Sequence, residues 1–246
     1  MFFLILIVII SYVLLHAIEI AAFGSRVAGR ITNRAALGTT LTQTIYTIGD
    51  FLLILFLPSL GYIVESGISI TDYLIIVLVA YTLTLMVSII IIIRLNSLQH
   101  FYQVIFSKYK NNTIPLAILM SLINKKTDFN AKNCDVLSFD KIILKKTLVS
   151  SLAYIFLVTG FFNAFMLAIL FPEHRLTLTG FTTVFHGFGA VIFAFYLDPM
   201  LSRSIDTYSD NVTWLKNVYS ILLGRMFSYL AMIISISIAL YYLKFL

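Results

Sequence analysis

Long apolar runs separated by short polar segments dominate the hydrophobic pattern of this chain. Six runs are long enough to cross a hydrocarbon core of about 30 Å, which takes about 20 residues. They occupy residues 2–23, 35–57, 72–93, 147–171, 177–197 and 221–243. The pattern predicts an all-α polytopic membrane protein, with six transmembrane helices in one transmembrane domain over residues 1–246.

The second run is the most polar, because threonines, Gln43 and Asp50 lie within it, and burial against other helices would satisfy these groups. No basic residue precedes the first run and no clear small-residue cleavage site follows it. We therefore expect the first run to stay as a helix and not to be cleaved as a signal peptide.

Residues 95–146 form the one sizeable segment outside the predicted spans. Within it, residues 114–123 are apolar but too short to cross, and Pro115 suits the first turn of a helix. Nearby basic residues are Lys108, Lys110, Lys125 and Lys126. The short helix either lies along the cytoplasmic leaflet, where each basic residue gains about 1 kcal/mol from anionic lipid, or belongs to a plain linker.

The long segment divides the chain into two halves of three spans each. An odd number of spans gives the halves opposite orientations, which is the arrangement of the inverted repeats found in many transporters. The halves share no similarity at the level of individual residues. The repeat is therefore a hypothesis about topology alone.

Composition excludes a soluble globular protein. Of the 246 residues, 60% are hydrophobic and 11% are charged, whereas soluble domains carry about 25% charge. The net charge of +6 comes from residues spread between apolar runs, so we expect no nucleic-acid partner. The single cysteine, Cys134, excludes an internal disulfide and a multi-cysteine metal site.

The basic residues predict an orientation. All but two of the 17 lysines and arginines fall in or beside the first, third and fifth loops, and the two exceptions are Arg175 and Lys244. The positive-inside rule places those three loops, residues 95–146 included, in the cytoplasm. Both termini are then expected outside.

The first span carries charge on one face. At about 100° per residue, His16 and Glu19 share a face, and Arg26 returns to it if the helix continues through Gly24. An acidic side chain near the middle of a spanning helix costs roughly 2.5–3.5 kcal/mol. Glu19 is therefore expected to face a protein interior or a wet cavity.

Two further spans carry polar faces that can line the same cavity. The second has Thr39, Gln43, Tyr46 or Thr47, and Asp50, and the fifth has Thr179, Thr182 or Thr183, and His186, with Asp198 and Pro199 closing its cytoplasmic end. Threonines are expected merely to hydrogen-bond between helices. For His16, Glu19 and Asp50 we favour a functional role, because their charge is costly in a membrane.

The third, fourth and sixth spans are expected to be scaffold. Small residues recur at Gly160, Ala164 and Ala168 in the fourth, and from Gly224 to Ala239 in the sixth, where they allow close helix approach. Arg225 lies one turn inside a membrane boundary, from which its side chain can snorkel. No soluble-enzyme motif occurs, and the four histidines are scattered, so we expect neither a metal nor a cofactor.

The first helix and its loop carry a family resemblance. Residues 16–19 read His-Ala-Ile-Glu and residues 26–32 read Arg-Val-Ala-Gly-Arg-Ile-Thr. This resembles the signature of the Amj family, lipid II flippases that act as alternates to MurJ, in which His-x-Ile-Glu-Thr precedes Arg-x-Ala-Gly. Asp198-Pro199 looks like the Asp-Pro loop of the family. Ile20 departs from its threonine, and Asp50 ends a stretch where the family has an arginine-containing sequence.

The resemblance implies a flippase that moves lipid II from the cytoplasmic to the outer leaflet of the bacterial inner membrane. The candidate substrate contacts are His16, Glu19, Arg26, Arg30, Gln43, Asp50, His186 and Asp198. Arginine suits a diphosphate through its planar fork, and pairing of Glu19 with Arg26 or His16 would leave no unpaired charge. The alternatives are an integral-membrane enzyme acting on lipid phosphate or acyl groups, with His16 and Glu19 as acid and base, and a non-transporting accessory subunit.

Overall fold

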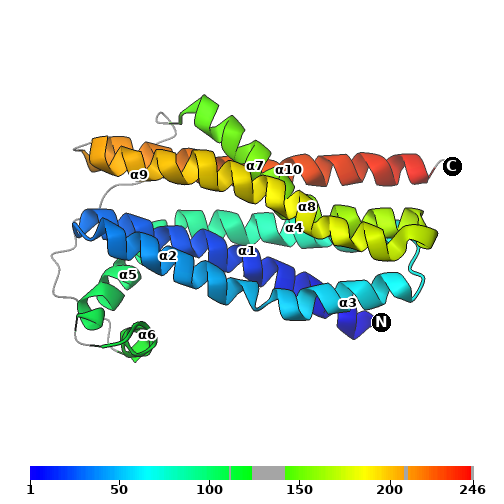
Figure 1. The fold of residues 1–246 in the computed structure, drawn as a ribbon, viewed down its shortest axis with the longest axis horizontal. Helices are drawn as coiled ribbons and strands as arrows, with labels where there is room; N and C mark the ends of the chain where they lie inside the picture. Colours follow the sequence, from blue (N-terminus) through cyan, green and yellow to red (C-terminus); the bar gives the residue numbers. More distant parts are fainter. Residues whose placement is uncertain (111, 124–141, 208–209, 245–246) are drawn as a thin grey trace.

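The computed structural model describes residues 1–110, 112–123, 142–207 and 210–244, and these residues form helices and no strand. Six helical segments are long and apolar enough to span a membrane, so the protein is an all-α, multi-pass membrane protein as predicted (Figure 1). The helices are α1 (Phe2–Ile31), α2 (Ala35–Asp50), α3 (Leu53–Glu65), α4 (Ile70–Ile93), α5 (Leu95–Tyr109), α6 (Ile114–Ile123), α7 (Leu144–Leu170), α8 (Arg175–Ile192), α9 (Asp198–Thr207) and α10 (Asn211–Leu243).

Helices α1 and α10 extend well beyond the apolar runs that predicted them. The added part of α1 is mostly buried, including every residue from Gly24 to Gly29, and the added part of α10 buries Trp214 and Asn217. Hydropathy identifies segments that are apolar enough for lipid. The added turns of α1 and α10 are instead stabilised by packing against other helices. Arg26 and Arg30 therefore lie on the same continuous helix as His16 and Glu19.

The second span is longer than predicted and is interrupted. It runs from Ala35 to Glu65, and α2 passes into α3 at Phe51 and Leu52, where backbone N–H groups donate to the carbonyl three residues earlier. Pro58 lies inside α3 and cannot donate to the carbonyl of Ile54. The chain before this proline is therefore wound more tightly than an α-helix, and this short turn is the interruption.

The fifth span is interrupted as well, and here the prediction was wrong. Asp198 and Pro199 do not close the helix, which continues through α9 to Thr207. A π-helical turn over Phe193–Leu197 joins α8 to α9, and the N–H of Asp198 donates to the carbonyl of Phe193. Pro199 has no N–H for the carbonyl of Phe195, and this loss at the junction accounts for the irregular turn.

The two halves of the chain repeat one packing pattern. In the first half α1 packs against α2, α3 and α4, and in the second half α7 packs against α8 and α10. The third spans, α4 and α10, pack against each other where the halves meet. Figure 1 shows α1 to α4 on one side of the bundle and most of α7 to α10 on the other, with both termini at one end.

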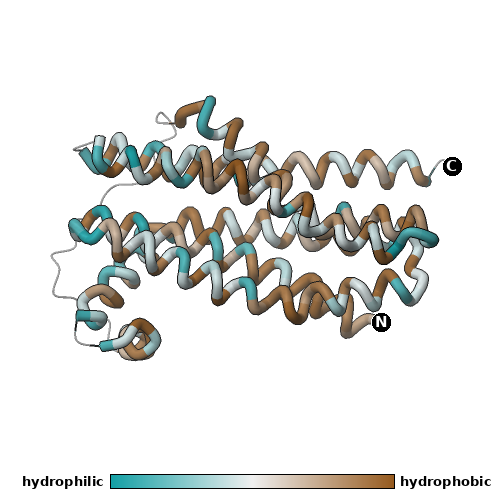
Figure 2. The backbone as a smooth tube through the Cα atoms, in the orientation of Figure 1, coloured by the Kyte–Doolittle hydropathy of each residue, from teal (hydrophilic) through white to brown (hydrophobic). Residues whose placement is uncertain are grey.

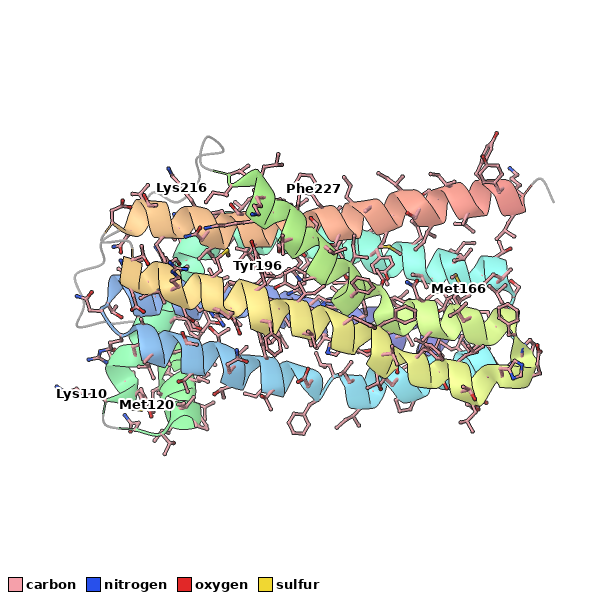
Figure 3. All side chains as sticks on the ribbon, turned by 45° about the horizontal axis from the view of Figure 1, so that its top comes forward. Lys110, Met120, Met166, Tyr196, Lys216 and Phe227 are labelled. Carbon is pink, nitrogen blue, oxygen red and sulfur yellow. The ribbon has the colours of Figure 1, made fainter. Side chains whose placement is uncertain are left out.

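Most basic residues of the described chain lie at the end of the bundle opposite the two termini, which is the basic end. The polar ends of the helices stand out from the apolar middle in Figure 2, and Lys110 and Lys216 both lie at the basic end in Figure 3. Helix α5 also lies there and packs its buried Tyr102, Ile105 and Phe106 near α1 and α6. In the described part of residues 95–146, Leu95–Tyr109 and Ile114–Ile123 are therefore helical.

Helix α6 coincides with the short apolar helix predicted at residues 114–123. It is seen nearly end-on in Figure 1, so its axis runs across the bundle, and its exposed side chains include Leu119, Leu122 and Ile123. A helix in this position suits a membrane surface, and its place along the cytoplasmic leaflet stays a prediction. Cys134, Lys125, Lys126, Lys132 and Lys141, which the charge pattern assigned to this loop, lie outside the described residues.

Close packing holds α8 against α7 through glycine. Gly189 is the one buried residue of α8, and a Cβ atom there would lie 2.6 Å from Leu157 Cγ and 2.7 Å from the carbonyl oxygen of Ala153. Gly160 of α7 approaches Phe185 in the same way, as its small-residue pattern predicted. Gly187, also on α8, has no atom within 4 Å of such a Cβ.

Gly189 and Gly187 give a matched pair for testing the α7–α8 contact. Gly189→Ala is expected to lower stability by about 1–3 kcal/mol, because the backbone of α7 must move to admit the methyl group. Gly187→Ala should be neutral or slightly stabilising, because alanine favours the helix. The midpoint of thermal unfolding in detergent measures both, and equal midpoints for the two variants would contradict the packing described.

Candidate functional site

A cavity of about 430 Å³ lies between α1, α2, α7, α8 and α10. Its polar lining consists of His16, Glu19, Gln43, Tyr46, Thr47, Asp50, Tyr154, His186, Asp198 and Arg225. Six of the eight residues predicted as substrate contacts are among them, whereas Arg26 and Arg30 are not. The polar faces of the first, second and fifth spans thus meet at one cavity.

Four of the charged or titratable lining residues lie near the middle of their spans. Glu19 belongs to a helix running from Phe2 to Ile31, Asp50 to one from Ala35 to Glu65, and Arg225 to one from Asn211 to Leu243. His186 is similarly central in the segment from Pro172 to Thr207. A membrane around these helices would place all four side chains close to its midplane, where charge is most costly.

Glu19, His16 and Arg225 form one charged cluster. The Arg225 guanidinium donates to Glu19 Oε2, and its Nη2 lies 2.7 Å from His16 Nδ1. His16 Nδ1 lies 3.0 Å from the same Glu19 oxygen. The expected partner His16 is present, but Arg26 does not pair with Glu19, because Arg225 from the far end of the sequence takes that place.

Arg225 is buried and does not snorkel. Its side chain is 1% exposed, its Nε donates to the hydroxyl oxygen of Tyr229 at 3.0 Å, and its guanidinium lies 4.7 Å from the ring centre of Tyr154. These aromatic contacts and Glu19 replace the water that a surface arginine would have. The sixth helix is therefore part of the site, and the signal for it was an arginine within an apolar run.

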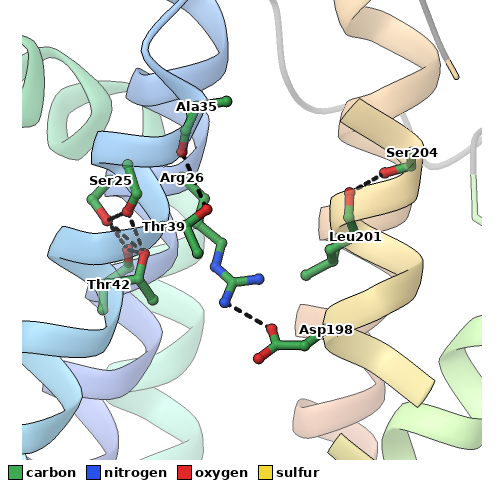
Figure 4. Close-up of polar contacts among 10 residues, drawn as sticks. Ser25, Arg26, Ala35, Thr39, Thr42, Asp198, Leu201 and Ser204 are labelled. Carbon is green, nitrogen blue, oxygen red and sulfur yellow. Dashed lines mark hydrogen bonds and ion pairs between the residues drawn. The ribbon is translucent and has the colours of Figure 1, made fainter. Parts of the chain in front are cut away.

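A second ion pair closes the basic end of the cavity. Arg26 Nη2 donates to Asp198 Oδ1 at 2.7 Å, across the space between α1 and α9 (Figure 4). One turn further on, Arg30 donates to the carbonyl oxygen of Ile205 at 2.7 Å and to Asn211 Oδ1 at 3.2 Å. The arginines of α1 thus bind α9 and the start of α10.

Most threonines of the polar faces bond within their own helix. Thr39 and Thr47 donate to the carbonyls of Ala35 and Gln43, and the expectation of bonds between helices fails for them. Thr42 is different, since its hydroxyl lies 2.6 Å from that of Ser25 on α1 (Figure 4). The polarity of the cavity therefore comes mainly from its charged, histidine and amide side chains.

The walls of the cavity on one side are α2 and α8. Helix α2 packs on α1, α8 packs on α7, and α2 and α8 do not pack closely against each other. Both helices expose apolar side chains beside the polar lining, including Ile48 on α2 and Val184 and Phe188 on α8. The cavity therefore lies beside a surface suited to lipid.

The described residues contain no group of three or more His, Cys, Asp or Glu side chains that could hold a metal ion. No family model, curated protein or solved structure matches the chain.

Proposed function

We propose that this protein is a flippase for a lipid-linked saccharide, and that lipid II is its substrate. The observation that carries the proposal is a cavity lined by the buried Arg225 and by Glu19 and Asp50, all near the middle of spanning helices, and bounded by two helices that do not pack closely on each other. A head group of diphosphate and sugar needs a polar passage, while its hydrocarbon tail can remain in lipid. The space between α2 and α8 offers the tail such a position.

The two interrupted helices support a transport mechanism. The α2–α3 and α8–α9 segments are the second spans of their halves, and both supply polar residues to the cavity. Interrupted helices in corresponding positions of two halves are the usual place of substrate sites in transporters built from inverted repeats. We infer that α1–α4 and α7–α10 are such halves and that movement of one against the other exposes the cavity alternately.

The size of the cavity and the ion pair at its basic end are those expected of a closed conformation. At about 430 Å³ it falls near the low end of the range for small-ligand sites, and it can hold only part of a large glycolipid head group. The Arg26–Asp198 ion pair closes it toward the basic end. Entry of a head group from that end therefore requires α9 to move away from α1.

The resemblance to the Amj family supports lipid II as the substrate and the bacterial inner membrane as the location. Its His-x-Ile-Glu element coincides with the two α1 side chains of the charged cluster, His16 and Glu19. Its arginine element coincides with Arg26, which binds Asp198 of the Asp-Pro pair, here the first two residues of α9. Contact of Arg26 or Arg30 with the diphosphate stays a prediction, since both already bind protein groups.

A depletion experiment tests the function. A host whose resident lipid II flippase is depleted is expected to survive when it expresses this chain, and lipid II should appear in the outer leaflet. Failure of both, with the protein present in the membrane, would contradict the proposal. A purified protein that alters lipid II chemically in liposomes, without moving it, would favour the enzyme alternative.

Topology is a separate prediction. The charge pattern places the basic end in the cytoplasm and both termini outside. An impermeant maleimide should leave Cys134 unlabelled in intact spheroplasts and label it after lysis. In a Cys134→Ser background, Ser66→Cys should label before lysis and Ser202→Cys only afterwards. The reverse pattern would invert the orientation and the proposed side of substrate entry.

A further inference from the structure

The charges around the cavity do not balance. Three carboxylates line it, those of Glu19, Asp50 and Asp198. Glu19 is paired with Arg225 and Asp198 with Arg26, and Asp50 has neither an ion pair nor a hydrogen bond among the described residues. With neutral histidines the cavity therefore carries one excess negative charge, which is unfavourable for an anionic ligand.

Asp50 lies where an ionised carboxylate is costly. It is the last residue of α2, at the interruption of the second span, and this interruption is about midway along the bundle in Figure 1. A charged side chain near the centre of a membrane costs roughly 2.5–3.5 kcal/mol. Asp50 interacts electrostatically with Glu19, which adds repulsion, and with His186 across the cavity.

Two histidines of the lining have a buried nitrogen without a partner among the described residues. They are Nδ1 of His186 and Nε2 of His16, whose side chain is 3% exposed. Nδ1 of His16 lies within hydrogen-bond distance of both Glu19 and Arg225, and one nitrogen cannot donate to the first while accepting from the second. A second proton on His16 would favour its bond to Glu19 over that to Arg225, which keeps its bonds to Glu19 and Tyr229.

We infer that the cavity is a joint site for a diphosphate and a proton, in which Asp50 and the histidines His186 and His16 take up the proton when the anion binds. The inference rests on the proposed function, which supplies the anion. The proton comes from water and is held on an Asp50 oxygen or a ring nitrogen, with no covalent bond broken in the ligand. Arg225 then no longer donates to His16, and it lines the cavity that the diphosphate enters.

The physical reason is compensation of charge. A diphosphate adds negative charge to a cavity that already has an excess of it, and each proton taken up cancels one unit at mid-membrane depth. The titratable and charged groups facing this site come from every helix around it. They are His16 and Glu19 on α1, Tyr46 and Asp50 on α2, Tyr154 on α7, His186 on α8, Asp198 on α9, and Arg225 and Tyr229 on α10, with Arg26 behind Asp198.

Calorimetric titration of the full chain in detergent tests the inference. Farnesyl diphosphate is added in two buffers of different ionisation enthalpy, and the difference in heat gives the protons taken up per ligand bound. We expect net uptake, after correction for the protonation of the free ligand. Because the complex holds the extra proton, affinity should fall as the pH rises, by up to about tenfold per pH unit for one proton.

Variants identify the groups. Asp50→Asn and His186→Gln should each reduce the uptake while binding persists, and the matched changes Asp206→Asn and His174→Gln, outside the cavity, should leave it unchanged. Inorganic pyrophosphate gives a second arm. Uptake with both probes assigns the site to diphosphates in general, uptake with farnesyl diphosphate alone assigns it to lipid diphosphates, and either result supports the inference.

Three outcomes would overturn the inference. Binding without proton uptake removes the proton site and leaves the proposed function standing. Uptake that is undiminished in the triple variant His16→Gln/Asp50→Asn/His186→Gln assigns the protons to other groups, and binding that requires sodium and ignores pH replaces the proton by a metal cation. Absence of any binding, in folded protein, contradicts the proposed function and the inference together.

Discussion

Arg225→Ala is expected to lower stability by about 3–5 kcal/mol and to abolish transport. The substitution leaves the Glu19 carboxylate with His16 as its one partner in the cluster, and removing one member of a buried ion pair leaves an uncompensated charge. It also removes the contacts of the guanidinium with Tyr154 and Tyr229. Arg203→Ala, at an exposed position of α9, is the control and should behave like the wild type.

Glu19→Gln separates the role in transport from the role in folding. It keeps the size of the side chain and removes its charge, so we expect a smaller loss of stability than for Arg225→Ala but a complete loss of complementation. Arg225 retains its bond to Tyr229 in this variant. Complementation by Glu19→Gln at the wild-type level would show that the charge of Glu19 is not needed.

A double variant measures the coupling between the two charges. Glu19→Gln/Arg225→Gln contains no uncompensated charge, and thermal unfolding should show it to be more stable than Arg225→Gln alone. Additive losses would contradict the ion pair. A double variant that folds and also complements fully would reduce the pair to a structural role.

The polar cavity could be predicted from the sequence, because its residues violate the apolar pattern of their spans. Glu19, Asp50 and His186 stand out as costly residues at helical spacing, and spacing alone places them on particular faces. The partners of Glu19 could not be predicted in this way. Arg225 is distant in sequence, and no local pattern records which helices pack together.

The interruptions of the second and fifth spans were also beyond the hydrophobic pattern. Hydropathy averages over a window and reports lipid compatibility, whereas the junctions at Phe51 and at Phe193–Leu197 depend on missing hydrogen bonds near Pro58 and Pro199. The prolines were visible, but Pro199 was interpreted as the end of a helix. The continuation to Thr207 depends on α9 packing near α10 and on the bonds from Arg26 and Arg30.

The Arg26–Asp198 pair can be tested by exchanging its charges. Asp198→Arg alone should abolish transport, because it places two arginines together where α1 meets α9, and Arg26→Asp alone should do so by pairing two carboxylates. The loss of one charged hydrogen bond corresponds to about 1.5–3 kcal/mol, before repulsion is added. We expect the exchanged variant Arg26→Asp/Asp198→Arg to recover folding and a measurable part of the activity.

This experiment distinguishes closure of the cavity from direct contact with substrate. If Arg26 acts through Asp198, either orientation of the pair can hold α9 against α1, and complementation should follow the pairing of opposite charges at the two positions. If Arg26 binds the diphosphate itself, an aspartate at position 26 repels the diphosphate. The exchanged variant then stays inactive although its thermal stability recovers. In that case Asp198→Asn retains activity. The structure places Arg26 outside the lining of the cavity and 2.7 Å from Asp198, so we expect the first result.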